Sequence, residues 1–199
     1  MKRRDALKKI GLAAGFAIAT PSIVSIFQSC SLDTKTWEPK FLSLDEKTVL
    51  TNLVDIILPK TATTPSASEV NVPQFIDKYI DEVLDIEDQE ITKNAFSKVM
   101  ALLKPSETAE IDEVTTAQYT NLLDTYLLLK GDIDQEREAD PEAKTLTQSE
   151  FFEQLKWMTI NAYTKSEQVG KNILIYDPIP TTYYCGDLEE LTAGKAYSL

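Results

Sequence analysis

Residues 50–80 read LTNLVDIILPKTATTPSASEVNVPQFIDKYI, and this stretch decides the fold. Its first part places apolar side chains at helical spacing, and Pro59 ends that run because proline cannot continue a helix. A loop rich in Pro, Ser and Thr follows, and Pro73 then opens a second helix. The apolar residues of this second helix are Phe75, Ile76, Tyr79, Ile80, Val83 and Leu84. The stretch therefore predicts two helices joined by a loop.

The sequence on either side predicts further helices. A capping box at residues 43–46 starts the first helix, and a second box at residues 147–150 starts the last one. Between them, apolar residues at helical spacing predict one helix over 87–104 and another over 116–131. No segment alternates apolar and polar residues for long enough to form a sheet. We therefore predict an all-α fold, a helical domain of about five helices over residues 43–199 with a loop-rich C-terminal tail.

The composition excludes several classes of site and partner. The 199 residues include no histidine and only two cysteines. Without histidine no Ser-His or Cys-His nucleophile can form, and two cysteines cannot hold an iron–sulfur cluster or a structural zinc. The net charge is −12, and because the first 29 residues carry +4, the rest carries −16. Such a surface repels phosphate backbones, so we expect no nucleic-acid partner.

The many acidic residues do not form a recognisable site. Asp132, Asp134 and Glu136 begin like a calcium-binding loop, but that motif needs Gly at its sixth position and Glu at its twelfth. Arg137 and Ala143 occupy those positions. Adjacent carboxylates elsewhere lack the apolar setting of a catalytic pair. We therefore predict no catalytic, cofactor-binding or metal-ligating residue in this chain, and we expect that it is not an enzyme.

The N-terminus has the pattern of an export signal. Arg3, Arg4, Leu7 and Lys8 are spaced as in the twin-arginine signal, whose pattern is R-R-x-F-L-K. The apolar run over 10–19 is too short to span a bilayer, which takes about 20 apolar residues. The alternative is that the paired arginines form the basic region of a general secretory signal. In either case the sequence predicts export from the cytoplasm.

A cysteine follows the predicted signal. Residues 27–30 read FQSC, which resembles a loose lipobox with Ser29 as the small residue before Cys30. Lipidation of Cys30 would leave residues 1–30 as the signal peptide and residues 31–42 as a polar tether. The alternative is an ordinary cleavage site with a free or disulfide-bonded cysteine beside it. We expect an exported, periplasmic protein that is anchored to a membrane by lipid.

Aromatic residues crowd the last third of the chain. We expect the helical Trp157 to lie in the core. The tail tyrosines differ, because a proline-containing loop cannot bury its own aromatics, and tyrosine is favoured at interfaces. Tyr183, Tyr184 and Cys185 are therefore the candidate partner interface. If Cys30 is lipidated, Cys185 is left either to form an intermolecular disulfide or to stay a free, buried thiol.

Two parts of the chain together resemble a known family. The first part is Asp55-Ile56-Ile57-Leu58-Pro59, a Thr/Pro/Ser loop, and then VPQFID over 72–77. The second part, residues 151–186, ends in a Pro-x-Pro and an aromatic-Cys-Gly sequence. In order and spacing they are similar to the small third subunit of gluconate 2-dehydrogenase. The resemblance covers roughly residues 44–186.

The resemblance implies a function for the chain. Small subunits of this family are not catalytic and pair with a large flavin-dependent subunit of the glucose–methanol–choline oxidoreductase type. FAD is then expected in that partner and no cofactor in this chain, with a cytochrome c as a candidate electron acceptor. The small subunit would supply the export signal and stabilise the flavoprotein, whose substrate is a sugar, sugar acid or polyol. The alternative is a stand-alone periplasmic or surface lipoprotein that binds carbohydrate or protein.

Overall fold

The computed structural model describes residues 37–104, 110–128, 135–177 and 185–198. The chain divides into two units, residues 1–37 and 38–199, and the account below concerns the second. Several predicted features lie outside the described residues: the end of the helix predicted to reach Gly131, the export-signal residues Arg3, Arg4, Leu7 and Lys8, the lipidation site Cys30, and the tail residues Tyr183 and Tyr184.

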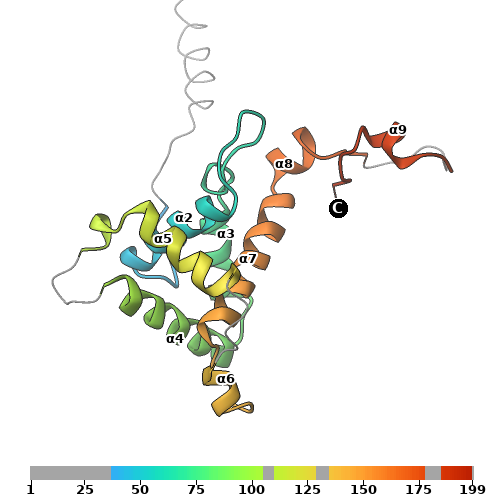
Figure 1. Ribbon diagram of the computed structural model, residues 1–199. Coiled ribbons are helices and arrows are strands. Elements are labelled where there is room, and N and C mark those ends of the chain that lie inside the picture. The colour runs from blue at the N-terminus through green and yellow to red at the C-terminus, as the bar shows by residue number, and fades with distance from the viewer. Residues whose placement is uncertain (1–36, 105–109, 129–134, 178–184, 199) are drawn as a thin grey trace, which may run out of the picture. The chain divides into compact units, whose positions relative to one another are not determined.

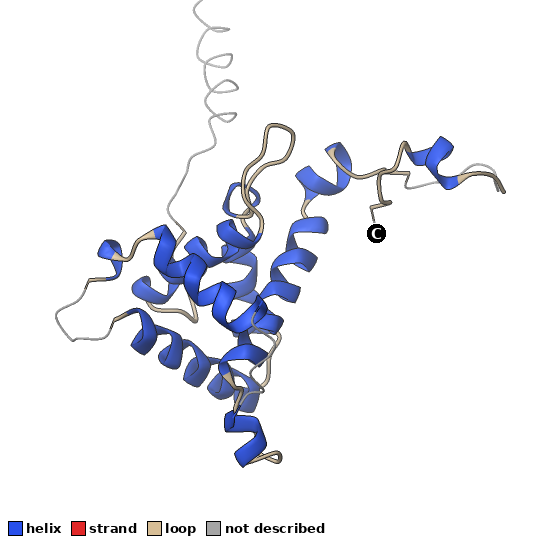
Figure 2. Ribbon diagram, in the orientation of Figure 1, coloured by secondary structure: helices blue, strands red, loops and turns tan. Residues whose placement is uncertain are grey.

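The described residues are helical, without a β-strand (Figures 1 and 2). Five helices have eight or more residues: α2 (Leu44–Ile57), α3 (Val72–Glu82), α4 (Ile86–Leu103), α5 (Thr116–Leu123) and α7 (Gln148–Thr164). The shorter helices are α6 (Gln135–Ala139), α8 (Glu167–Asn172) and α9 (Leu188–Thr192). The predicted all-α fold of about five main helices is confirmed.

Local sequence signals set the helix boundaries. Ser43 and Thr147 start α2 and α7 with the predicted capping boxes, in which each hydroxyl accepts a hydrogen bond from the N3 amide. Thr115 makes a third box at the start of α5, which the sequence analysis did not identify. After Leu123 the helix widens into a π-helical turn over Asp124–Leu128. A regular helix was predicted there, and hydrophobic spacing alone does not distinguish the two.

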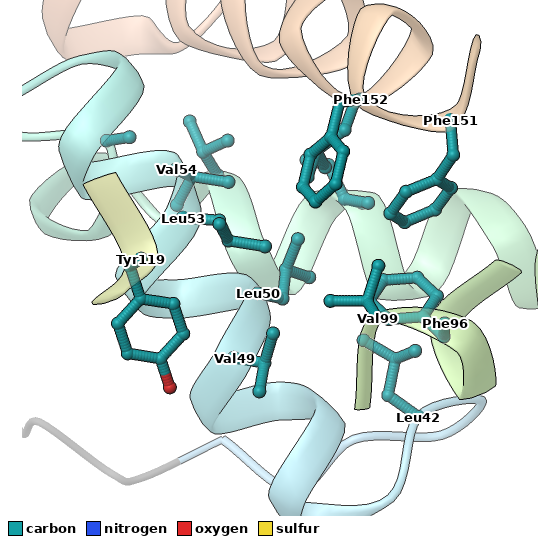
Figure 3. Packing of buried hydrophobic residues seen from close by; sticks show 14 of the residues in the cluster. Leu42, Val49, Leu50, Leu53, Val54, Phe96, Val99, Tyr119, Phe151 and Phe152 are labelled. Atoms are coloured by element: carbon teal, nitrogen blue, oxygen red, sulfur yellow. The ribbon is translucent and has the colours of Figure 1, made fainter. Parts of the chain in front are cut away.

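The core is built around α2, whose apolar side chains point toward α4 and α7 (Figure 3). Phe151 of α7 meets Phe96 of α4 edge to face, with ring centroids 5.0 Å apart. Phe152 stacks on Tyr126 with centroids 5.6 Å apart. The residues of α2 in this cluster are fully buried: Val49, Leu50, Leu53 and Val54. Three helices far apart in sequence are therefore held together by one close-packed cluster.

Two acidic residues of the family-like stretch, Asp55 and Asp77, brace the backbone. The carboxylate of Asp77, on α3, accepts hydrogen bonds from the backbone amides of residues 40, 41 and 42, at 2.8, 3.1 and 2.9 Å. Asp55, on α2, accepts from the amide and hydroxyl of Ser68 at 2.8 and 2.6 Å. Residues 40–42, which the sequence analysis assigned to the tether, are therefore part of the folded unit.

The structure corrects the expected place of Trp157. This side chain is 63% exposed on the outer face of α7 and does not lie in the core. The apolar side chains predicted for helix α3 fall into two sets. Ile76 and Ile80 are buried, whereas Phe75 and Val83, the residue just after α3, are exposed. A helix can bury only about one stripe of side chains against its own domain, and the second stripe faces outward.

The predicted loop-like tail contains one further short helix, α9. It is preceded by α8, which the sequence analysis also did not identify. The backbone of Ile175 pairs with that of residues 196 and 198, through hydrogen bonds of 2.9 Å each, which ties the C-terminal end of the chain to the segment after α8. At Gly170 of α8 an added Cβ would lie 2.9 Å from the Ser198 hydroxyl, so a side chain there would make that hydroxyl move.

Candidate interaction surface

One hollow on the helical body lies between α3 and α7, two helices that pack against each other (Figure 1). We call it the α3–α7 groove, and its volume is about 210 Å³. Helix α3 contributes three side chains and α7 contributes four, while Lys165 follows the end of α7. The lining residues are Phe75, Ile76, Tyr79, Trp157, Met158, Asn161, Ala162 and Lys165.

Helical spacing explains how these side chains meet. Phe75 and Tyr79 are four residues apart, so they share a face of α3, and their rings stack with centroids 6.3 Å apart. Trp157 and Asn161 have the same spacing on α7. Phe75 is 55% exposed, and large aromatic side chains gain most from being removed from water. The groove thus presents an aromatic surface that the described residues leave uncovered.

A second, more open hollow of about 490 Å³ lies beside the start of α7, and Trp157 belongs to its wall as well. Arg137 of α6 is one of the residues that line this hollow. The guanidinium donates to both oxygens of Glu150, at 2.9 and 2.7 Å, and to the carbonyls of Ala143 and Thr145. These bonds and those from Thr147 lower the pKa of Glu150. The Arg137–Glu150 pair joins the loop before α7 to the helix, and each of the two charges is neutralised by the other.

Glu46, one of the buried acids of the helical body, is also held by hydrogen bonds. Burial acts to raise the pKa of Glu46, but hydrogen bonds from the Lys93 ammonium and from Ser43 outweigh it and lower the pKa. The Lys93 nitrogen lies 2.7 Å from the Glu46 carboxylate, and the Ser43 amide lies 2.8 Å from it. Glu46 therefore closes the capping box of α2 and pairs with α4, which is a structural role.

Only one residue of the predicted tail interface, Cys185, is among the described residues. Its thiol is free and exposed, so the alternative of a buried cysteine is wrong for the isolated chain. Nearby apolar side chains of the tail are exposed as well, namely Tyr176, Leu188 and Leu191. The sequence placed its candidate interface in this tail, while it missed the α3–α7 groove. One signal in the sequence could have revealed the groove. The apolar residues of α3 cover a wider part of the helix surface than the single stripe that packs against the core.

The described residues contain no group of three His, Cys, Asp or Glu side chains arranged to hold a metal ion. None of their helices combines the length and the apolar character needed to cross a bilayer. The buried acids Asp77 and Glu46 are bonded to backbone amides and, for Glu46, to a lysine. The described surface presents an aromatic groove on the helical body and exposed apolar residues on the tail.

Comparison with known proteins gives one match. A family model described as Gluconate 2-dehydrogenase subunit 3 matches residues 44–181, which is more than half of the chain. No curated protein and no solved structure matches. The matched residues include all five main helices and the whole α3–α7 groove, whereas Cys185 and α9 follow them.

Proposed function

The chain belongs to the gluconate 2-dehydrogenase subunit 3 family, and from that premise we propose that it is the non-catalytic small subunit of an exported, FAD-dependent dehydrogenase. Membership makes it a subunit of a dehydrogenase complex. The finer proposal is that FAD and the reaction on a sugar, sugar acid or polyol belong to a large partner of the glucose–methanol–choline type. This chain then stabilises that partner and carries it out of the cytoplasm.

The chemistry of the chain supports a non-catalytic role. Histidine, the usual general base at neutral pH, is absent from the whole sequence. The acids Asp55, Asp77, Glu46 and Glu150 are each bonded to structural partners, so none is left as a poised acid or base. The exposed aromatic surface of the groove supports a binding role instead, because large apolar patches mark contact sites.

The observation that carries the proposal is the family match over all five main helices. The test is to isolate the tagged full-length protein from its native membranes and to identify what accompanies it. The proposal expects a larger subunit that carries about one FAD, recognised by its flavin absorbance and by mass spectrometry. A tagged protein that is recovered without any flavoprotein would contradict it.

Export is a separate part of the proposal and rests on the sequence of the first 30 residues. We expect the double substitution Arg3→Lys and Arg4→Lys to leave both subunits in the cytoplasm, while Lys8→Arg has little effect. Export of the double variant that stops only when general secretion is blocked would assign the signal to that route.

Lipidation of Cys30 would keep the protein close to a membrane. Asp77 holds the backbone from Lys40 onward, and the ten residues from Cys30 to Lys40 can reach at most about 35 Å. One acyl chain binds weakly, so stable anchoring takes the several chains of a bacterial lipoprotein. Mass spectrometry of the mature N-terminal peptide tests this, since an unmodified terminus at another residue would refute lipidation.

The C-terminal tail is the proposed second contact with the flavoprotein. The exposed Cys185 thiol supports a disulfide across the interface, with Tyr183 and Tyr184 packing beside it. The bond would appear as a heterodimer band on a denaturing gel without reductant, and Cys185→Ser would remove it. Separate bands from lysates with blocked thiols would exclude the covalent link, and replacing both tyrosines by alanine would still test docking.

A second candidate function is a stand-alone lipoprotein that binds carbohydrate. The exposed ring of Trp157 favours it, because an aromatic ring presents a flat apolar face to which a sugar ring can stack. Titration of the isolated protein with mono- and disaccharides, followed by tryptophan fluorescence, tests this candidate. A saturable change that Trp157→Ala abolishes would support it, and an unchanged signal would exclude it.

A further inference from the structure

The size of the α3–α7 groove indicates what it can receive. Its volume of about 210 Å³ is below the range of about 300–1,000 Å³ that is typical of small-molecule sites. Trp157 and Phe75 rise at its edges, and its floor includes the buried Ile76. Such a hollow suits one or two anchoring side chains of another protein, and anchors of this kind carry most of the binding energy at interfaces.

One of the residues that line the groove is charged, and it is the basic residue Lys165. From residue 154 to residue 165 the sequence carries Lys156 and Lys165 and no carboxylate, although acids outnumber basic residues 32 to 20 overall. Lys78, one helical turn after Phe75, is exposed on α3. Lys165 lines the groove, and its side chain forms no ion pair with a described residue.

We propose that the α3–α7 groove binds a segment of the flavin-binding subunit that inserts an aromatic or large aliphatic side chain and places a carboxylate against Lys165. This inference rests on the proposed function and names the surface that performs it. Apolar contact supplies most of the affinity, and the charge pair fixes the register of the segment.

A second copy of this chain fits the groove less well. In a two-fold symmetric contact each groove would face the same groove on the partner copy. A contact centred on the groove would then bring each Lys165 toward its counterpart, and the two like charges would repel each other. The two copies would also bring together two acidic chains, each with a net charge of −12. Both effects oppose self-association through this face.

The test uses the complex as it forms in the native host, with tagged variants replacing the chromosomal copy. Trp157→Ala combined with Phe75→Ala removes the apolar walls, and Lys165→Glu reverses the charge. The controls are Ile86→Ala, at a residue that is 76% exposed on α4, and Lys60→Glu, in the exposed loop after α2, where Lys60 pairs with Glu69. Reductant is present throughout, so that a disulfide from Cys185 cannot hold the subunits together.

The measured quantity is FAD-containing subunit retained per tagged chain, with far-UV circular dichroism to establish that each variant is folded. We expect retention to fall at least about tenfold for both groove variants and less than about twofold for both controls. The loss caused by Lys165→Glu should shrink when wild-type and variant are compared at high salt, because salt screens the charge pair.

Each contrary result has a distinct meaning. Folded groove variants that retain the flavoprotein as well as the wild type would overturn this inference and leave the proposed function standing. A wild-type protein that retains no flavoprotein would overturn both. Sedimentation that shows a wild-type homodimer lost in the Trp157→Ala, Phe75→Ala variant would assign the groove to a second copy, and sugar binding lost in that variant would assign it to carbohydrate. Either result would also overturn the inference.

Discussion

Phe152 and Trp157 are aromatic residues of the same helix with opposite surroundings. Phe152 lies in the core, stacked on Tyr126 and fully buried (Figure 3), while Trp157 is exposed beside the α3–α7 groove. The two lie five residues apart, so they project from opposite faces of α7. One face of this helix thus builds the domain, and the other lines the groove that we propose binds the flavoprotein.

The largest expected effect comes from the core side of this comparison. Phe152→Ala removes a fully buried ring and leaves a cavity, so we expect the free energy of unfolding to fall by about 3–5 kcal/mol. Urea denaturation followed by circular dichroism measures the change. A loss below about 1 kcal/mol would mean that the cluster around α2 is not close-packed.

The Asp77 carboxylate should come next in size. Asp77→Asn keeps the side-chain shape but removes the charge and one acceptor oxygen, so an amide among residues 40–42 loses its partner. We expect a loss of about 1–3 kcal/mol and faster hydrogen exchange at those amides. Exchange that stays slow there, in a destabilised variant, would contradict the bracing role of Asp77.

A pH-dependent contribution is expected from Glu46. Its pKa is lower in the folded state than its ordinary value of 4.5, so ionised Glu46 stabilises the fold above that value. The contribution is lost as the pH falls through the lowered pKa. The stability difference between wild type and Glu46→Gln should therefore be full at pH 7 and shrink in acid. The control is Glu90→Gln, an exposed glutamate of α4, and an equal pH trend in both variants would refute the assignment.

The smallest effect on stability should come from a substitution in the α3–α7 groove. Trp157→Ala removes a side chain that is already largely in water and places a strong helix former on α7, so the free energy of unfolding should change by less than about 0.5 kcal/mol. Denaturation of this variant beside Phe152→Ala completes the comparison. A loss above about 2 kcal/mol would mean that Trp157 lies in the core, as expected from the sequence.

The comparison also explains which features the sequence could predict. Capping boxes at Ser43 and Thr147 and the stop at Pro59 are local signals, so the main helices and the all-α fold were predicted correctly. Periodicity also marks apolar faces, but a face buried in the core and a face reserved for a partner have the same spacing. Trp157 was misplaced for this reason, because the choice depends on which stripe the neighbouring helices cover.

Sequence patterns are limited in the same way for the C-terminal tail and for the hydrogen bonds that Asp77 accepts. The exposure of Cys185 did not follow from the sequence, which left this thiol either bonded to a partner or free and buried. The role of Asp77 did not follow, since its three amide donors come from a segment more than thirty residues away. Contacts between distant segments form only when the helices pack, and single-sequence patterns do not encode their partners.

We propose that this chain binds and exports a flavoprotein and performs no redox chemistry itself. This proposal is tested most directly by separating the subunits of the native complex and measuring FAD, metal and dehydrogenase activity in each fraction. We predict that all the FAD and all the activity follow the large subunit, and that this chain shows no visible absorbance. A stoichiometric flavin, haem or metal in the isolated small subunit, or dehydrogenase activity from it alone, would contradict the account.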